Sequence, residues 1–313
     1  MRVIFLLTLS SCIEFGIDPI DPDEAPNQLV AVTDEFVQTP LPAVDILFVV
    51  DDTASMEQEQ AALSDDFSAL SADLATAGIR WQIGVVTTDM AADEAGELRG
   101  NPWILTPETA SLGTRFSEMI QVGTQGNADE AGLAAAILAL QLTDAGEANA
   151  GFRRPNAGLH VIFVSDSDDN SDGYLTDPVG EFLTLLDSQG TAAVPAVASS
   201  LVGDVPAGCV SVMGTAVAGF RYAEVAQTTG GAEVSICATD FSPILETLGE
   251  VSISYQRTFV LSAIPLADSV RVSIGGVGVE QGFEVDLEVG AITFDQPPAP
   301  EAAIVVNFLV GNE

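Results

Sequence analysis

The stretch ILFVVDDTASM, residues 46–56, decides the fold of this chain. Its first five residues form a continuous apolar run, which is typical of a β-strand buried on both faces. Acidic and hydroxyl residues follow directly. Apolar residues at helical spacing come next, at Leu63, Phe67, Leu70 and Leu74. A buried strand that leads straight into a helix is the building unit of folds with parallel sheets.

The same alternation of strand and helix patterns continues to about residue 255. Apolar runs at residues 83–86, 161–164 and 192–197 indicate further buried strands, and helical spacing appears between them, for example over residues 133–140. We therefore predict an α/β fold over residues 44–255, with a doubly wound, mostly parallel sheet and helices on both faces.

The pattern changes after residue 255. Val270, Val272 and Ile274 alternate with polar residues, and residues 283–289 alternate in the same way. A period of two predicts strands with one face in water. We expect residues 256–313 to form a small all-β module of the sandwich type.

The charge of the chain excludes several classes of partner. Its 313 residues include 46 acidic and 9 basic residues, for a net charge of −37. Nucleic acids and anionic membrane surfaces are bound through clusters of Lys and Arg, so we expect no nucleic acid and no electrostatic docking on a membrane. The apolar fraction of 47% provides enough material for a core.

The N-terminus has the order of an export signal. Residues 1–12 combine one Arg, a short apolar run and the sequence Leu-Ser-Ser-Cys. The end of this segment resembles the bacterial lipobox, which implies that Cys12 is lipidated and that the protein is held at the outer membrane or cell surface. Ordinary signal cleavage and a misassigned start remain alternatives. Residues 13–43 are acidic and rich in proline, which indicates an extended tether.

Two further cysteines, Cys209 and Cys237, remain after Cys12. In an exported chain, two remaining cysteines indicate one disulfide. A zinc site is not expected, because there is no Cys-x-x-Cys pair and His160 is the only histidine. A catalytic triad would have to use His160, and no nucleophile motif lies near it, so we expect no enzyme of that type.

The residues after the first buried strand suit a hard cation. Asp51, Thr53 and Ser55 follow each other at spacings of two, at the carboxyl end of a parallel strand where ligands commonly bind. Their oxygen atoms are the ligands that Mg²⁺ and Ca²⁺ prefer. The simpler interpretation of Ser55 is a helix N-cap.

A second acidic cluster strengthens the prediction of a cation site. The strand at residues 161–164 also ends in acidic residues, beginning with Asp166. If the two strands are neighbours, Asp51 and Asp166 lie around one ion.

Together, these residues resemble the von Willebrand factor type A (vWA) domain. Its metal-ion-dependent adhesion site, MIDAS, has the form Asp-x-Ser-x-Ser, completed by a Thr and an Asp from two other loops. The resemblance implies that Thr53 and Ser55 contact Mg²⁺, or Mn²⁺ or Ca²⁺, through their hydroxyls. It also implies that Asp51 and Asp166 act directly or through water, and that a partner's carboxylate completes the coordination.

One element of the family pattern is missing. The expected Thr position falls near Asn127, in the loop of residues 121–130. We assign the role to Thr124, three residues upstream; Asp129 is the substitute if neither Thr124 nor Asn127 binds.

A second cation site is also suggested by the sequence. Asp168, Asn170 and Asp172, followed by Gly173, have the spacing of a Ca²⁺ loop, although the closing Glu is absent. A solvated acidic loop is the alternative interpretation of residues 168–173.

These observations predict an exported, lipid-anchored protein that binds a protein or glycan partner through a divalent cation. The alternative is a scaffold lipoprotein whose cation only stabilises the fold. A weaker third interpretation is a metal-assisted hydrolase, which would need a base close to a metal-bound water.

Overall fold

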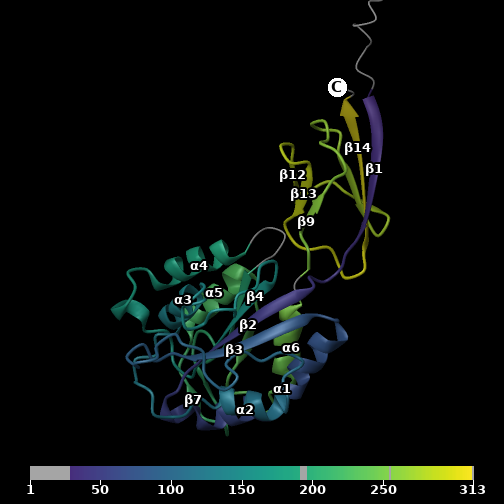
Figure 1. Ribbon diagram of the computed structural model, residues 1–313. Helices are drawn as coiled ribbons and strands as arrows, with labels where there is room; N and C mark the ends of the chain where they lie inside the picture. Colours follow the sequence, from purple (N-terminus) through teal and green to yellow (C-terminus); the bar gives the residue numbers. More distant parts are fainter. Residues whose placement is uncertain (1–28, 191–195, 254, 312–313) are drawn as a thin grey trace, which may run out of the picture.

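The computed structural model describes residues 29–190, 196–253 and 255–311, which form an α/β unit and a smaller β unit (Figure 1). The sheet of the α/β unit has the strand order β3-β2-β4-β5-β8, and every neighbouring pair is parallel. The predicted parallel sheet is confirmed. Its strands are β2 (Ala43–Val50), β3 (Arg80–Thr87), β4 (Gly158–Val164), β5 (Ala196–Val202) and β8 (Glu233–Ser235).

Helices cover both faces of this sheet. Ile46 and Phe48 of β2 point into one apolar cluster, and Leu47 and Val49 point into the other, which is why this strand is continuously apolar. The first face carries α1 (Glu57–Thr76), α2 (Leu112–Ile120) and α6 (Ser242–Ser252). The second carries α3 (Gly132–Gln141), α4 (Pro178–Gln189) and α5 (Phe220–Thr229).

The second unit consists of two antiparallel sheets that share one core. Phe259, Ile292 and Ile304 belong to one apolar cluster although they come from both sheets, so the sheets pack face to face. One sheet has the order β1 (Leu29–Val37), β14 (Ala303–Gly311), β10 (Arg271–Ile274), β11 (Val277–Val279). The other has the order β12 (Phe283–Asp286), β13 (Ala291–Phe294), β9 (Thr258–Val260).

The expected tether is wrong for residues 29–37. They form β1, which pairs with β14 along its whole length, from Leu29 opposite Gly311 to Val37 opposite Ala303. Its apolar side chains contact the sandwich core, while Asp34 accepts hydrogen bonds from the backbone N–H and hydroxyl of Ser262. The α/β unit is therefore inserted between two strands of the sandwich. Residues 1–28, with the signal sequence and Cys12, lie outside the described part of the chain.

The connection between the two units shows which edge of the parallel sheet lies next to the β unit. Residues 38–42 lead from β1 into β2, and Gln38 donates a hydrogen bond from Nε2 to the carbonyl of Gln256 at 2.9 Å. Because β2 begins at this junction, its carboxyl end and the loop after it lie at the opposite edge of the parallel sheet. In the described residues, no helix is long and apolar enough to span a membrane.

A short hairpin lies between β5 and α5. It consists of β6 (Cys209–Val210) and β7 (Thr215–Ala216). Cys209 is joined to Cys237, which follows β8, so the predicted disulfide is present and holds the hairpin to the end of this edge strand. Two short 3₁₀ helices, η2 (Ala54–Met56) and η3 (Ser171–Gly173), lie in the loops after β2 and β4.

Candidate metal site

The loops after β2 and β4 lie side by side. These strands are neighbours in the sheet, and the backbone N–H of Asp51 donates to the carbonyl of Val164 at 2.9 Å. The Ser165 hydroxyl, one residue before Asp166, donates to Oδ2 of Asp51 at 2.7 Å. The two acidic clusters found in the sequence therefore meet at one edge of the sheet.

Asp51 is the centre of a compact group of oxygen atoms. Its side chain is fully buried, and Oδ1 accepts hydrogen bonds from the backbone N–H of Thr53 at 2.9 Å and from the Thr53 hydroxyl at 2.6 Å. The Thr53 hydroxyl lies 3.3 Å from that of Ser55. Ser55 is exposed, so the group opens to solvent on that side.

The hydroxyls of this group do not serve as helix caps. Thr53 is the N-cap residue of η2 and Met56 that of α1, and neither makes a side-chain capping hydrogen bond. The N-cap interpretation of Ser55 is therefore wrong. Because helix capping does not use the hydroxyls of Thr53 and Ser55, both are available to a ligand.

Three further carboxylates interact electrostatically with Asp51. Asp166, Glu130 and Glu59 are all buried. Burial, followed by the charges of Asp51 and Asp166, raises the pKa of Glu130 to about 7. The pKa of Glu59 is raised by burial and then by Asp166 and Asp51, and burial also raises the pKa of Asp51. Each carboxylate makes it harder to ionise its neighbours, which is the environment that a divalent cation relieves.

Glu59 was not identified from the sequence, although a signal was present. It lies four residues after Ser55 and four before Leu63, which places it on the buried stripe of α1. Its Oε2 atom is buried and has no hydrogen-bond partner within the described residues. Leaving a buried carboxylate oxygen unsatisfied costs several kcal/mol in general, about the cost of losing a charged hydrogen bond, so water or a cation is expected at this position.

The loop of residues 121–130 lies against the first acidic loop. Gln60 donates from Nε2 to the carbonyls of Asp51 and Gly123, each at 2.9 Å, and the N–H of Gly126 donates to the carbonyl of Asp52 at 2.8 Å. A Cβ atom at Gly126 would overlap the Asp52 carboxylate. Only glycine lets the two loops approach this closely.

The residue that replaces the missing Thr stays a prediction. Thr124 is partly exposed in this loop, and its hydroxyl makes no hydrogen bond with any described residue. The backbone N–H of Asn127 donates to Asp89 Oδ2 at 3.2 Å, and Asp129 Oδ1 accepts from Asn170 Nδ2 at 3.2 Å. Among these loop residues, Glu130 is the one whose charge is coupled to both Asp51 and Asp166.

The side chains expected to form a second Ca²⁺ site do not share a centre. Asp172 pairs with Arg221 through two hydrogen bonds of 2.7 and 3.0 Å. Asp168 accepts from the backbone N–H groups of Asp169 and Arg221, while Asn170 turns to the loop of residues 121–130. Arg221 supplies the positive charge that a Ca²⁺ ion would otherwise bring to Asp172. This arginine lies about 50 residues away in the sequence, so the spacing of residues 168–173 gave no sign of it.

The donor set fits a hard cation. Two carboxylates and two hydroxyls from adjacent loops match the oxygen ligands of Mg²⁺, and they leave room for water or an external oxygen. Over the described residues, no group of three or more His, Cys, Asp or Glu is arranged to hold a metal. Any ion at this edge would therefore depend on Thr53 and Ser55 as well as on Asp51 and Asp166.

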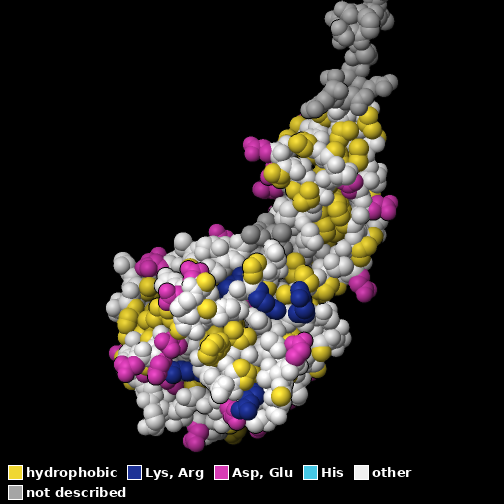
Figure 2. Space-filling view, viewed as in Figure 1, with side chains coloured by type: hydrophobic (Ala, Val, Ile, Leu, Met, Phe, Trp, Pro, Cys, Tyr) yellow, Lys and Arg dark blue, Asp and Glu magenta, His cyan; other side chains and the backbone are white. Residues whose placement is uncertain are grey.

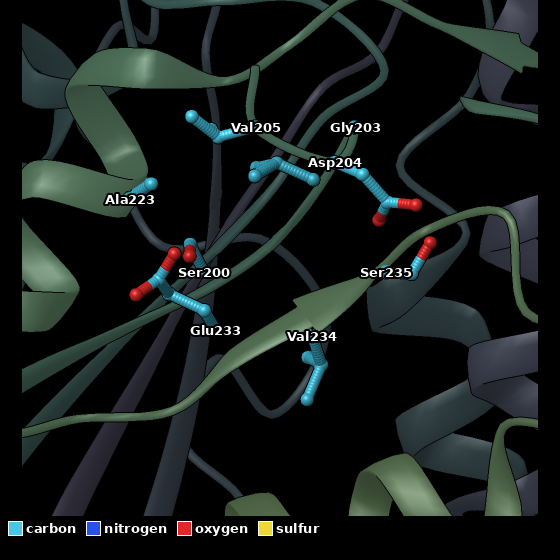
Figure 3. Close-up of a pocket in the computed structure, with 9 residues that line it drawn as sticks. Ser200, Gly203, Asp204, Val205, Ala223, Glu233, Val234 and Ser235 are labelled. Carbon is cyan, nitrogen blue, oxygen red and sulfur yellow. The ribbon is translucent and has the colours of Figure 1, made fainter. Parts of the chain in front are cut away.

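Two other polar features are separate from this site. His160 is fully buried, with its ring nitrogens 2.7 Å from the hydroxyls of Ser252 and Ser199, and burial lowers its pKa to about 3. A hollow of about 210 Å³ between β5, β8 and α5 is drawn in Figure 3. Ser200 and Glu233 line it from adjacent strands, and Asp204 points away from them.

No family model and no curated protein sequence matches this chain. Similar solved structures include a von Willebrand factor type A protein from Catenulispora acidiphila, with 10% identity, a TM-score of 0.43, and coverage of 92% of this chain and 67% of that chain. The pilus adhesin SpaC from Lactobacillus rhamnosus GG has 13% identity and a TM-score of 0.40, with coverage of 91% and 42%. Proximal thread matrix protein 1 from the mussel byssus, in a form with a zinc-occupied MIDAS motif, has 16% identity and a TM-score of 0.44, with coverage of 72% and 49%. The chain spans less than half of the length of the last two.

The strand order and the layers of the α/β unit define its fold class. A parallel sheet in the order β3-β2-β4-β5-β8 has three helices on each face and carries Asp51-x-Thr53-x-Ser55 at its carboxyl edge. The α/β unit therefore has the doubly wound, parallel α/β fold that the sequence predicted.

Proposed function

We propose that this protein is exported and binds a partner through a divalent cation held by Asp51, Thr53, Ser55 and Asp166. The observation that carries the proposal is the geometry of Asp51, whose two oxygens accept from Thr53 and from Ser165, the first residue after the neighbouring strand β4. These hydrogen bonds fix the Asp51 carboxylate beside the hydroxyls of Thr53 and Ser55, which are not used as helix caps. Mg²⁺ is the first candidate, with Mn²⁺ and Ca²⁺ as alternatives, and Thr124 is proposed as the additional ligand.

A partner-binding site must be open, and the exposed Ser55 supports this. Neutral hydroxyl ligands leave a bound cation with unsatisfied charge, so a carboxylate from a partner would complete its coordination. The similar solved structures include an adhesin and a matrix protein. A protein or glycan partner offering an acidic group is therefore the class we propose.

Export and surface anchoring belong to the same proposal. The Cys209–Cys237 disulfide favours an oxidising compartment. Leu29 pairs with Gly311 at one end of the sandwich, and β1 runs from there towards β2, whose far end carries Asp51. If Cys12 is lipidated and residues 13–28 act as a tether at the outer membrane or cell surface, this path would direct the cation site away from the membrane.

The experiment that tests the site is calorimetric titration of the metal-free protein with Mg²⁺, Mn²⁺ and Ca²⁺. Asp51→Asn is nearly isosteric and should abolish saturable binding, whereas the matched control Asp168→Asn should retain it. Binding that survives in Asp51→Asn and disappears in Asp168→Asn would move the cation to the loop of residues 168–173 and reject the proposal.

A purely stabilising cation is the second candidate, because the buried carboxylate of Glu59 favours an ion that only neutralises charge. Water-proton relaxation with bound Mn²⁺ separates the two functions. An open site keeps metal-bound water that exchanges with solvent and enhances relaxation, whereas an enclosed stabilising ion gives little enhancement.

A further inference from the structure

The β6–β7 hairpin and the residues next to it carry apolar side chains that face solvent. Val210 is 78% exposed, Val217 is 58% exposed and Phe220 is 51% exposed. Single exposed apolar side chains are common on protein surfaces, but a group of them around one hollow marks an interaction site.

These three residues line one hollow of about 550 Å³, formed by residues 206–210, 215–218 and 220. None of its lining residues is charged, although the chain carries 46 acidic residues and acidic side chains are scattered over the visible face of both units (Figure 2). Thr215 provides the only polar side chain among them, apart from the disulfide-bonded Cys209. We call this hollow the hairpin groove.

The hairpin groove lies next to the candidate metal site. The backbone N–H of Val217 donates to the carbonyl of Asp166 at 2.9 Å. At the tip of the hairpin, a Cβ atom on Gly214 would lie 3.0 Å from Oε1 of Glu59. The Cys209–Cys237 disulfide fixes the base of the hairpin, so the groove keeps its place beside the acidic loops.

We propose that the hairpin groove and the cation form one docking surface for an extended protein segment that carries an Asp or Glu next to apolar residues. This inference rests on the proposed function, and it chooses a protein segment over a glycan. The carboxylate of the segment would complete the coordination of the cation, and its apolar side chains would cover Val210, Val217 and Phe220.

The chemistry of the groove argues against other occupants. A glycan is recognised largely through side-chain hydrogen bonds, and the groove offers one hydroxyl for this purpose. A basic segment would be attracted by the net charge of −37, but it would gain nothing from an uncharged groove and offers no oxygen to complete the coordination of the cation. An extended apolar and acidic segment uses both parts of the surface.

A display library of random short peptides tests this inference. Peptides are selected on the full chain in millimolar Mn²⁺ and eluted with EDTA, so that only metal-dependent binders are recovered. We expect them to contain an Asp or Glu beside apolar residues. Val217→Ser should weaken their binding about tenfold, as for loss of an apolar anchor, and Asp51→Asn should abolish it. Val277→Ser, at a 70% exposed position of β11 in the sandwich, is the matched control and should have no effect.

The other outcomes overturn the inference in different ways. EDTA-eluted peptides that bind Val217→Ser normally would show that the cation site works without the groove. Enrichment of basic peptides would show that the acidic surface attracts partners instead. If calorimetry detects the cation and no peptide is enriched, the docking surface is rejected while the metal site stands. If calorimetry detects no cation, the proposed function itself fails.

Discussion

The carboxylates around Asp51 make the stability of the metal-free protein depend on pH. The pKa of Glu130 is raised from 4.5 to about 7, because the side chain is largely buried and faces Asp51 and Asp166. The folded state therefore holds this proton more tightly than the unfolded state does. Below the unfolded pKa of 4.5, both states are protonated and the stabilisation is complete; it is lost as the pH rises towards the folded pKa of about 7.

The size of this effect follows from the shift. At about 1.4 kcal/mol per pKa unit, the full shift would correspond to about 3 kcal/mol. Water still reaches part of this environment and screens the charges, so we expect a loss of about 2 kcal/mol of unfolding free energy from Glu130 between mildly acidic and neutral pH. Glu130→Gln removes the titrating group and should be more stable than the wild type above pH 7 by a similar amount.

Urea denaturation followed by tryptophan fluorescence measures this difference. Trp81 is 2% exposed within the core of the α/β unit and reports its unfolding, although Trp103, which is 51% exposed, adds a solvent-exposed background. Saturating Mg²⁺ should stabilise the wild type more at pH 8 than at pH 5, because the cation and the proton compete for the same carboxylates. If Glu130→Gln and the wild type lose stability equally as the pH rises, Glu130 is not coupled to the site and this reasoning is wrong.

Three further changes test contacts that stabilise the fold or hold the loops of the site together. Asp45→Asn removes a fully buried carboxylate that is paired with two arginines at 2.7 Å each; we expect a loss of about 3 kcal/mol by urea denaturation, and no loss would mean that the pairs do not stabilise the fold. Cys209→Ser opens a loop with a sequence separation of 28 and should cost about 3 kcal/mol, measured against the wild type with and without a reductant; equal stability in all cases would refute this. Gly126→Ala places a Cβ atom against Asp52 and should weaken Mg²⁺ binding in calorimetry, whereas Gly113→Ala, where a Cβ meets no atom within 4 Å, should not; equal affinities would contradict the close approach of the loops.

The sequence predicted those parts of the fold in which a single strand or helix has a recognisable pattern of apolar residues. The run of residues 46–50 is apolar throughout because helices cover both faces of β2, and this pattern gave the parallel sheet. The meeting of the loops after β2 and β4 was predictable for a related reason, because parallel strands end at the same edge. The helix α2 was missed, although Leu112, Phe116 and Ile120 recur at helical spacing.

The features that the sequence did not reveal depend on residues far apart in the chain. Asp172 looked like a Ca²⁺ ligand because its partner, Arg221, lies 49 residues away. Glu59 belongs to the buried stripe of α1, but a charged residue in a helix is normally expected at the surface. Its unpartnered oxygen and its electrostatic coupling to Asp51 and Asp166 can be recognised only in the folded structure.

The position of β1 has the widest consequence, because it changes what counts as one folding unit. Residues 29–37 lack a clear strand pattern, since Asp34 and Glu35 interrupt it and one face is open to water. The strand is defined by its nine residue pairs with β14. These pairs can form only after the whole α/β unit has been synthesised, because β14 follows it in the chain. A truncated chain that begins after residue 37 would leave β14 as an exposed edge and remove Phe36 from the sandwich core. Fragments designed to test the metal site should therefore begin no later than Leu29, because a later start would confuse damage to the sandwich with damage to the site.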